Sequence, residues 1–176
     1  MRIHAAGNAA GSESAVSRLE LLPWEREWAE YVALMRHNAN LSKRDAAHYE
    51  RDRMEDDMVA NIASCVAELA AAKRLNRYWS GSFWSAADHD RYKHLPDVGT
   101  NTEVKRIRKP RNPLPVRKRD VDADRVNVLV YPHPPEFVVV DVIGYGLARE
   151  LWEVGDPAMY DEDGTRLVAQ RLLKPL

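Results

Sequence analysis

An acidic residue beside a turn, followed by an acidic and a basic residue two positions apart, is the part of the chain best suited to chemistry. Asp97 precedes Gly99, and Glu103 and Lys105 follow in a stretch that predicts a short β-strand. Successive side chains of a strand point to opposite faces, so Glu103 and Lys105 share one face. Gly99-Thr100-Asn101 predicts a turn that folds Asp97 back beside Glu103.

Two carboxylates and an ammonium group that converge on one point suit the metal-assisted hydrolysis of a phosphodiester. A divalent cation supplies an activated water and neutralises charge on the phosphoryl oxygens. Asp97, Glu103 and the backbone carbonyl of Val104 are hard oxygen ligands of the kind that Mg²⁺ or Mn²⁺ prefers. Lys105 would orient or deprotonate the attacking water, or stabilise the charged phosphate. Glu68, from an earlier helix, is either a further carboxylate for a second ion or a metal-bound water, or a solvated surface acid.

Eight basic residues and no acidic ones occur between Lys105 and Arg119. Subtracting these eight from the 26 basic residues of the chain leaves 18 against 27 acidic residues, so the remainder is acidic although the net charge is −1. A basic segment on an acidic body favours a polyanion at one place. We therefore expect the phosphate backbone of DNA to contact Arg106, Arg108, Lys109, Arg111, Arg117, Lys118 and Arg119. The alternative is a solvated basic loop.

Helical periodicity dominates the first half of the chain. An amphipathic helix of about four turns is expected from Leu21 onward. Its apolar stripe, which we expect to lie in the core rather than to stack on bases, consists of Trp24, Trp28, Tyr31, Val32 and Met35. Ser42 is expected to cap a second helical region. The strongest pattern predicts a helix over about 54–75, Ala-rich and carrying Glu68 and Cys65.

The second half predicts strands. Two β-branched runs, over 125–131 and 136–143, read as adjacent antiparallel strands, of which the second is central and ends at Gly144 and Gly146. A helical turn over 147–152 and a last strand over 166–173 after a turn at 161–164 are also expected. Three prolines (Pro110, Pro113 and Pro115) argue against a continuous helix or strand in their loop. The fold class is thus α/β or α+β, with a central mixed or antiparallel sheet of four to five strands flanked by helices.

The composition is that of an ordinary globular protein. At 176 residues, with 45% hydrophobic and 30% charged residues, we expect a tail over 1–19 and a single domain over 20–176. The single cysteine, Cys65, excludes an intramolecular disulfide and a cysteine-rich zinc site. No signal pattern or long apolar run is evident, so a soluble, cytoplasmic protein that does not bind membranes is expected.

These residues resemble the PD-(D/E)xK nuclease superfamily, with Pro96-Asp97 and Glu103-Val104-Lys105 as its signature. The helix segment 67–70, the turn 97–99 and the segments 116–120 and 142–145 further resemble small endonucleases encoded by bacteriophages. The resemblance covers about residues 25–176. It implies a restriction-endonuclease-like fold and magnesium-dependent cleavage of duplex or branched DNA. Structure-specific or junction-resolving cleavage falls within this expectation. A phage-encoded enzyme of this kind would act in a bacterial host cell. By position, Asp97 and Glu103 become metal ligands, Lys105 the catalytic lysine and Glu68 the helix-borne acid.

Two other interpretations remain open at this point. One is a non-catalytic DNA-binding or virion-associated protein that keeps the nuclease fold. The other treats Glu103 and Lys105 as an exposed cross-strand pair that contributes little energy. The exonuclease-type Gln-x3-Tyr element is not evident after Gln170, and Asp88-His89-Asp90 with His94 lacks the spacing of a zinc site. The sequence is also compatible with a homodimer.

Overall fold

A computed structural model of the chain describes residues 16–41, 55–92 and 94–176. Seven strands form two sheets within these ranges. The larger is a mixed four-stranded sheet whose order is β1 (Ser17–Glu20), β5 (Val139–Leu147), β4 (Val126–Pro132) and β2 (Thr102–Arg106). The smaller sheet has the order β3 (Leu114–Arg117), β7 (Asp161–Val168) and β6 (Asp156–Ala158). The expected α+β class with a four-stranded mixed sheet is confirmed.

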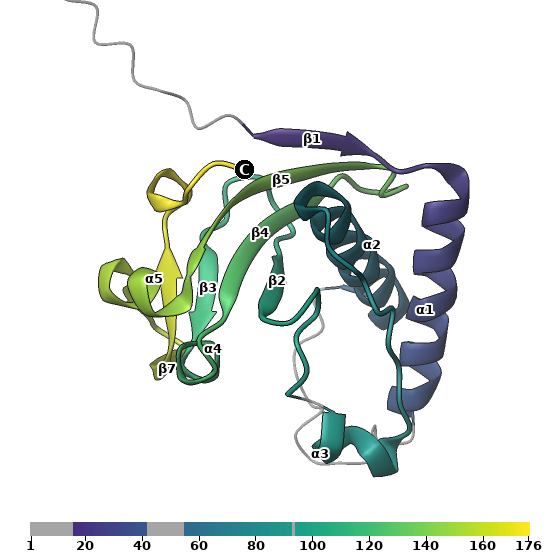
Figure 1. The fold of residues 1–176 in the computed structure, drawn as a ribbon, viewed down its shortest axis with the longest axis horizontal. Coiled ribbons are helices and arrows are strands. Elements are labelled where there is room, and N and C mark those ends of the chain that lie inside the picture. The colour runs from purple at the N-terminus through teal and green to yellow at the C-terminus, as the bar shows by residue number, and fades with distance from the viewer. Residues whose placement is uncertain (1–15, 42–54, 93) are drawn as a thin grey trace, which may run out of the picture.

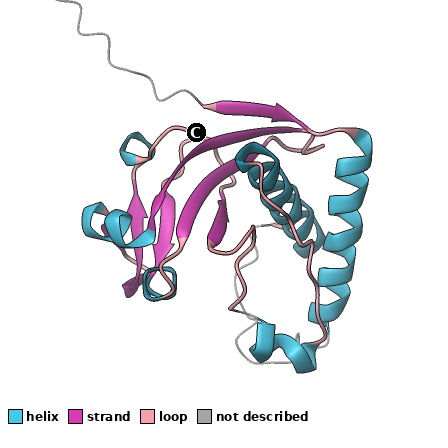
Figure 2. Cartoon of the chain, in the orientation of Figure 1, coloured by secondary structure: helices cyan, strands magenta, loops and turns pink. Residues whose placement is uncertain are grey.

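The helices of the described ranges, all but the short α3 (His89–Tyr92), divide between the two faces of the larger sheet (Figures 1 and 2). The helices are α1 (Pro23–Leu41), α2 (Asp57–Leu75), α3 (His89–Tyr92), α4 (Lys118–Asp122) and α5 (Ala148–Val154), with 3-10 turns at Ala86–Asp88 and Gln170–Leu172. Helix α2 packs on β2, β4 and β5, and α1 packs on α2. The smaller sheet lies on the opposite face together with α4 and α5. Two buried apolar clusters result, one on each face.

The link between β2 and β4 positions the chemistry-bearing residues. The two strands are parallel, with Lys105 paired to Leu129, so the chain must cross back between them. It does so through β3 and α4, which carry the last three basic residues of the segment, Arg117, Lys118 and Arg119. The end of the basic segment is thereby brought back next to the strand on which the segment begins.

Helix α2 forms where the sequence predicted, and its caps explain its ends. The Asp56 carboxylate accepts hydrogen bonds from the backbone N–H groups of Met58 (2.8 Å) and Val59 (3.2 Å). Asn76, in the left-handed conformation, ends the helix after Leu75. Cys65 is fully buried among the alanines, as expected for a core thiol. The second helical region expected from Ser42 lies outside the described residues.

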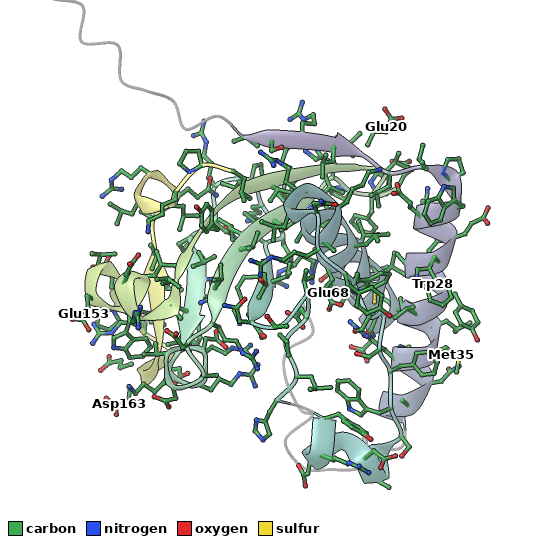
Figure 3. The ribbon with its side chains drawn as sticks, in the orientation of Figure 1. Glu20, Trp28, Met35, Glu68, Glu153 and Asp163 are labelled. Atoms are coloured by element: carbon green, nitrogen blue, oxygen red, sulfur yellow. The ribbon has the colours of Figure 1, made fainter. Side chains whose placement is uncertain are left out.

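The aromatic stripe of α1 is not in the core, contrary to expectation. Val32 is fully buried, but Trp24 is 62% exposed, Trp28 45% and Tyr31 49%. In Figure 3 the labelled Trp28 and Met35 project from the side of α1 that faces away from α2. The helix buries the neighbouring stripe instead, because Ala29, Val32 and Ala33 allow close approach to the alanine-rich surface of α2.

Several expected boundaries in the sheets were wrong. The expected tail over 1–19 overlaps β1, which pairs with β5 through residues 17–20, whereas residues 1–15 lie outside the described ranges. Strand β3 contains Pro115, which is tolerated because β3 is at the edge of its sheet. Strand β7 begins at Asp161, where a turn was expected, because the tight turn occupies residues 159–160, directly before the strand.

Strand β5 also continues through Gly144 and Gly146, where the sequence suggested an end. These glycines are sites of close approach rather than terminators. A Cβ atom on Gly144 would lie 2.8 Å from Leu173 Cβ and 2.9 Å from the Lys174 carbonyl oxygen, and one on Gly146 would meet Leu151 at 2.8 Å.

None of the helices in the described ranges combines the length and apolar character needed to cross a bilayer.

Replacing Gly144 by Ala is therefore expected to destabilise the protein. The added methyl group must displace the C-terminal segment at Leu173 and Lys174, which pairs with Tyr145 across the strand. Overpacking of this kind costs about 1 to 3 kcal/mol of the free energy of unfolding. Urea denaturation followed by circular dichroism measures it, and an unchanged midpoint would show that the C-terminal segment yields without cost.

Candidate active site

A tight turn brings Asp97 back against β2, as the sequence predicted. Val98 and Thr102 exchange two backbone hydrogen bonds of 3.1 and 3.2 Å around a turn in which Gly99 has a φ of +59°. Glycine adopts this left-handed conformation without strain. Asp97 Oδ2 then accepts a hydrogen bond from the Val104 backbone N–H at 2.8 Å. The carboxylate is thereby fixed beside the strand that carries Glu103.

Lys105 lies at the centre of an ion-pair network. Its Nζ is 2.8 Å from Asp120 Oδ2 and 3.2 Å from Glu103 Oε1, and the residue is only 7% exposed. Asp120, at the start of α4, is 2% exposed and also accepts a hydrogen bond from the Arg117 backbone N–H. This geometry is not that of an exposed cross-strand pair, because the lysine and both acids are largely withdrawn from water.

Glu68 faces inward from α2, and its carboxylate is held by two partners (Figure 3). Arg36 of α1 donates to both oxygens, at 2.6 and 2.9 Å, and the Trp79 indole N–H donates to Oε2 at 2.9 Å. Burial would lower the pKa of Arg36, but the adjacent Glu68 carboxylate raises it above its usual value. Glu68 is therefore a buried, paired acid and not a solvated one.

One cavity brings the four expected acid and base side chains together. Its volume is about 320 Å³, and we call it the lysine-side cavity; its lining comprises Ser64, Ala67, Glu68, Asp97, Glu103, Val104, Lys105, Arg106, Pro115 and Arg117. Glu68 comes from α2 and Asp97 from the turn. Glu103 and Lys105 come from β2, as does Val104. The residues proposed from their spacing are thus neighbours around a single space, with Val104 among them.

Asp97 carries the most perturbed carboxyl group of the site. Burial, followed by the negative charges of Glu68 and Glu103, raises its pKa to about 8, although the Val104 N–H and Lys105 act in the opposite direction. Three carboxyl groups therefore lie around the cavity, and burial together with repulsion from Glu68 and Glu103 disfavours the charged form of Asp97. An added cation would relieve this repulsion, and hard carboxylate oxygens match Mg²⁺ and Mn²⁺.

The oxygen atoms that could hold such a cation are those of Asp97, Glu103 and the Val104 carbonyl, since both Glu68 oxygens are engaged by Arg36 and Trp79. Mg²⁺ commonly keeps several waters beside one or two carboxylates, so two acids fit its chemistry. Across the described part of the chain, no group of three or more His, Cys, Asp and Glu side chains is placed to hold a metal ion. Asp88 therefore belongs to no such metal group, and its carboxylate accepts a hydrogen bond from the Ser85 hydroxyl.

A second cavity adjoins the first through shared walls. This aromatic-side cavity, also about 320 Å³, is lined by Arg36, Ala39, Ser82, Phe83, Trp84, Leu95, Pro96, Asp97, Glu103 and Arg119. Asp97 and Glu103 belong to both cavities, so the two acids stand between a lysine-bearing space and an aromatic one. Arg119, whose side chain is 60% exposed, lies 3.8 Å from both Glu103 Oε1 and Asp120 Oδ1.

The expected DNA-contacting residues are placed unevenly. Arg117 lines the lysine-side cavity and Arg119 the aromatic-side cavity. Arg106 lines the first cavity but is held by both oxygens of Glu55, at 2.7 and 3.1 Å. Lys118 pairs with Asp122 within α4 and lies over the Trp152 ring. The remaining three, on the exposed loop that follows β2, are Arg108, Lys109 and Arg111.

Sequence reasoning missed three residues that support the site. Asp120 pairs with Lys105, and Arg36 with Glu68. Asn127 is fully buried at the β4 position that pairs with Glu103, and neither of its amide atoms has a hydrogen-bond partner among the described residues. The sequence signals for Asp120 were its position directly after three basic residues and its place in the segment 116–120 of the resemblance, neither of which gave it a role. Arg36 and Asn127 gave none, because each meets its neighbours only through the fold.

No protein-family model, curated protein or solved structure matches this chain.

Proposed function

We propose that this chain is a metal-dependent endonuclease that hydrolyses phosphodiester bonds in DNA. The observation that carries the proposal is the convergence of Asp97, Glu103, Lys105 and Glu68 on one cavity, where burial and the two neighbouring acids also raise the pKa of Asp97 to about 8. Strongly perturbed acids in a cleft are typical of catalytic sites. The order α2, turn, β2 and a parallel β4 supports the restriction-endonuclease-like arrangement that the signature implies.

Each residue has a role in this proposal. Asp97, Glu103 and the Val104 carbonyl would hold Mg²⁺ or Mn²⁺, which when bound supplies an activated water and neutralises phosphoryl charge. Lys105, kept in place by Asp120 at 2.8 Å, presents its ammonium group to the scissile phosphate or the attacking water. Arg36 and Trp79 fix Glu68 as the acid that faces Asp97 from the helix.

Arg117 and Arg119 are the basic residues best placed to contact the DNA backbone, since each lines one of the two cavities and is exposed. Replacing both by Ala should weaken DNA binding and reduce the slope of log K against log salt by roughly 1.8. Fluorescence anisotropy over a salt series measures the slope. Arg171→Ala, an exposed arginine at Gln170–Leu172, is the control, and equal slopes for all three proteins would show that the pair makes no phosphate contact.

The proposal is tested by incubating the purified protein with linear, nicked, branched and single-stranded DNA in Mg²⁺, Mn²⁺ or EDTA. We expect cleavage of at least one substrate that requires the metal and is lost in Asp97→Asn. Binding without cleavage of any substrate, with wild type and Asp97→Asn indistinguishable, would contradict the proposal.

A non-catalytic DNA-binding protein of the same fold is the second candidate. The observation that favours it is the engagement of both Glu68 oxygens by Arg36 and Trp79, which makes the helix-borne acid structural. In that case Arg117 and Arg119 would still determine the salt slope, but Mg²⁺ would leave the DNA intact.

A further inference from the structure

We propose that the aromatic-side cavity binds an unpaired nucleobase next to the phosphodiester bond that is cleaved. The inference rests on the proposed function and narrows it. The substrates would be DNA in which a base is free of its partner at the cleavage point: single strands, branches, flaps or a duplex with a displaced base.

The wall of this cavity exposes apolar side chains that a folded chain would ordinarily bury. Phe83 is 41% exposed and Leu95 53%, and Trp84 and Pro96 complete the apolar part of the lining. The Trp84 ring lies 5.8 Å from the Tyr92 ring, which fixes its position. A pocket of about 320 Å³ whose lining includes two aromatic rings is at the lower end of the sizes that small ligands occupy.

The charges at the cavity favour a neutral, flat occupant over a second phosphate. Two arginines line it. The charge of Arg36 is balanced by Glu68, and its Nε donates to the Ser82 carbonyl at 3.0 Å, whereas the exposed Arg119 lies 3.8 Å from Glu103 Oε1. Glu103 adds negative charge on the side shared with the lysine-side cavity, where the Asp97 carboxyl also lies. Bases stack on aromatic side chains whatever their sequence, because each base has a π-face.

Continuity with the proposed active site identifies the occupant as part of the same nucleotide chain. A phosphate positioned at Asp97 and Glu103 is joined to its base by a single sugar, and the aromatic wall begins at these two acids. A base paired within a duplex has both faces stacked and cannot enter such a pocket, so occupancy requires an unpaired base. Arg119, at the same cavity, is placed for an adjacent phosphate.

The exposed aromatic residues of α1 provide a matched control. Trp24 is 62% exposed and lies at the opposite end of α1 from Arg36 and Ala39, which line the cavity. It shares aromatic character with Phe83 but has no acid of the proposed site beside it.

The test measures binding of a single-stranded oligonucleotide with a central 2-aminopurine, in EDTA so that no cleavage occurs. We expect quenching of its fluorescence by the wild-type protein and a loss of affinity of about 5- to 100-fold in Phe83→Leu. Phe83→Tyr, which keeps the ring, should retain near-wild-type affinity, and Trp24→Ala should not change it. Equal affinities of wild type, Phe83→Leu and Phe83→Tyr would overturn the inference, as would equal affinities for a fully paired duplex and the single strand.

These outcomes are separable from those of the proposed function. Metal-dependent cleavage of duplex DNA that is unaffected by Phe83→Leu would overturn the base pocket and leave the nuclease standing. Base-dependent quenching that requires Phe83, with no cleavage of any DNA in Mg²⁺ or Mn²⁺, would support the pocket and remove the nuclease.

Discussion

Replacing Asp97 by Asn will abolish metal-dependent cleavage and at the same time stabilise the metal-free protein at pH 8. Asparagine keeps the size of the side chain, and its amide oxygen can accept the same hydrogen bond from the Val104 N–H. It removes the charge that Glu68 and Glu103 repel. The rate is expected to fall about 10³-fold or more, since a ligand of the proposed ion is lost.

The stability gain follows from the raised pKa of Asp97. In the unfolded chain this carboxyl releases its proton near the usual 3.8, whereas in the folded protein it holds the proton to about pH 8. The folded state therefore binds more protons between these values, and the free energy of unfolding falls as the pH rises through this window. Because the carboxyl is partly exposed at the cavity wall, we expect Asp97→Asn to recover on the order of 2 kcal/mol at pH 8 and almost nothing at pH 4.

Urea denaturation at a series of pH values, in EDTA, measures this difference. Asp156→Asn, in an exposed strand of the smaller sheet, is the control and should leave the pH profile unchanged. A wild-type stability that is flat between pH 5 and 8, or a destabilised Asp97→Asn, would mean that burial and the neighbouring acids do not raise the pKa of Asp97 in the folded protein.

Replacing Lys105 by Ala is expected to have a comparable effect on cleavage and the opposite effect on stability. Loss of the ammonium group removes the only lysine that lines the two cavities in the described ranges, and the rate should fall about 10³-fold. Asp120 loses its closest cation while it remains 2% exposed, which costs about 3 kcal/mol. Cleavage assays and urea denaturation on the same preparation measure both.

A second substitution separates folding from catalysis. In Lys105→Ala combined with Asp120→Asn the uncompensated charge is gone, so stability should recover while cleavage stays absent. Lys174→Ala, at an exposed lysine that pairs with Glu150 and lines neither cavity, should cleave like the wild type. Cleavage at the wild-type rate by the double variant would remove Lys105 from the mechanism.

The local part of this site could be predicted from the sequence because short-range geometry determines it. Strand alternation places Glu103 and Lys105 on one face, and Gly99 at positive φ folds Asp97 onto the Val104 N–H. Helix α2 follows equally from its alanines and its capping residue Asp56. In each case the partners are at most a few residues apart in the chain.

What the sequence did not reveal depends on contacts between distant elements. Arg36 reaches Glu68 across the α1–α2 interface, and Asp120 reaches Lys105 only because the chain returns through β3 and α4 before β4. The sequence predicted that α1 buries the wrong stripe of side chains. Periodicity does not reveal that the alanine-rich surface of α2 packs against the small Ala29 and Ala33 and leaves Trp24 exposed.

The most direct test of the account is to soak crystals of the protein in Mn²⁺ and to locate the ion by anomalous scattering. We expect one peak between the Asp97 and Glu103 carboxylates, facing Lys105, that disappears in Asp97→Asn. A map without a peak at these acids, from crystals of a protein that still cleaves DNA in Mn²⁺, would contradict the central claim that they hold the catalytic cation.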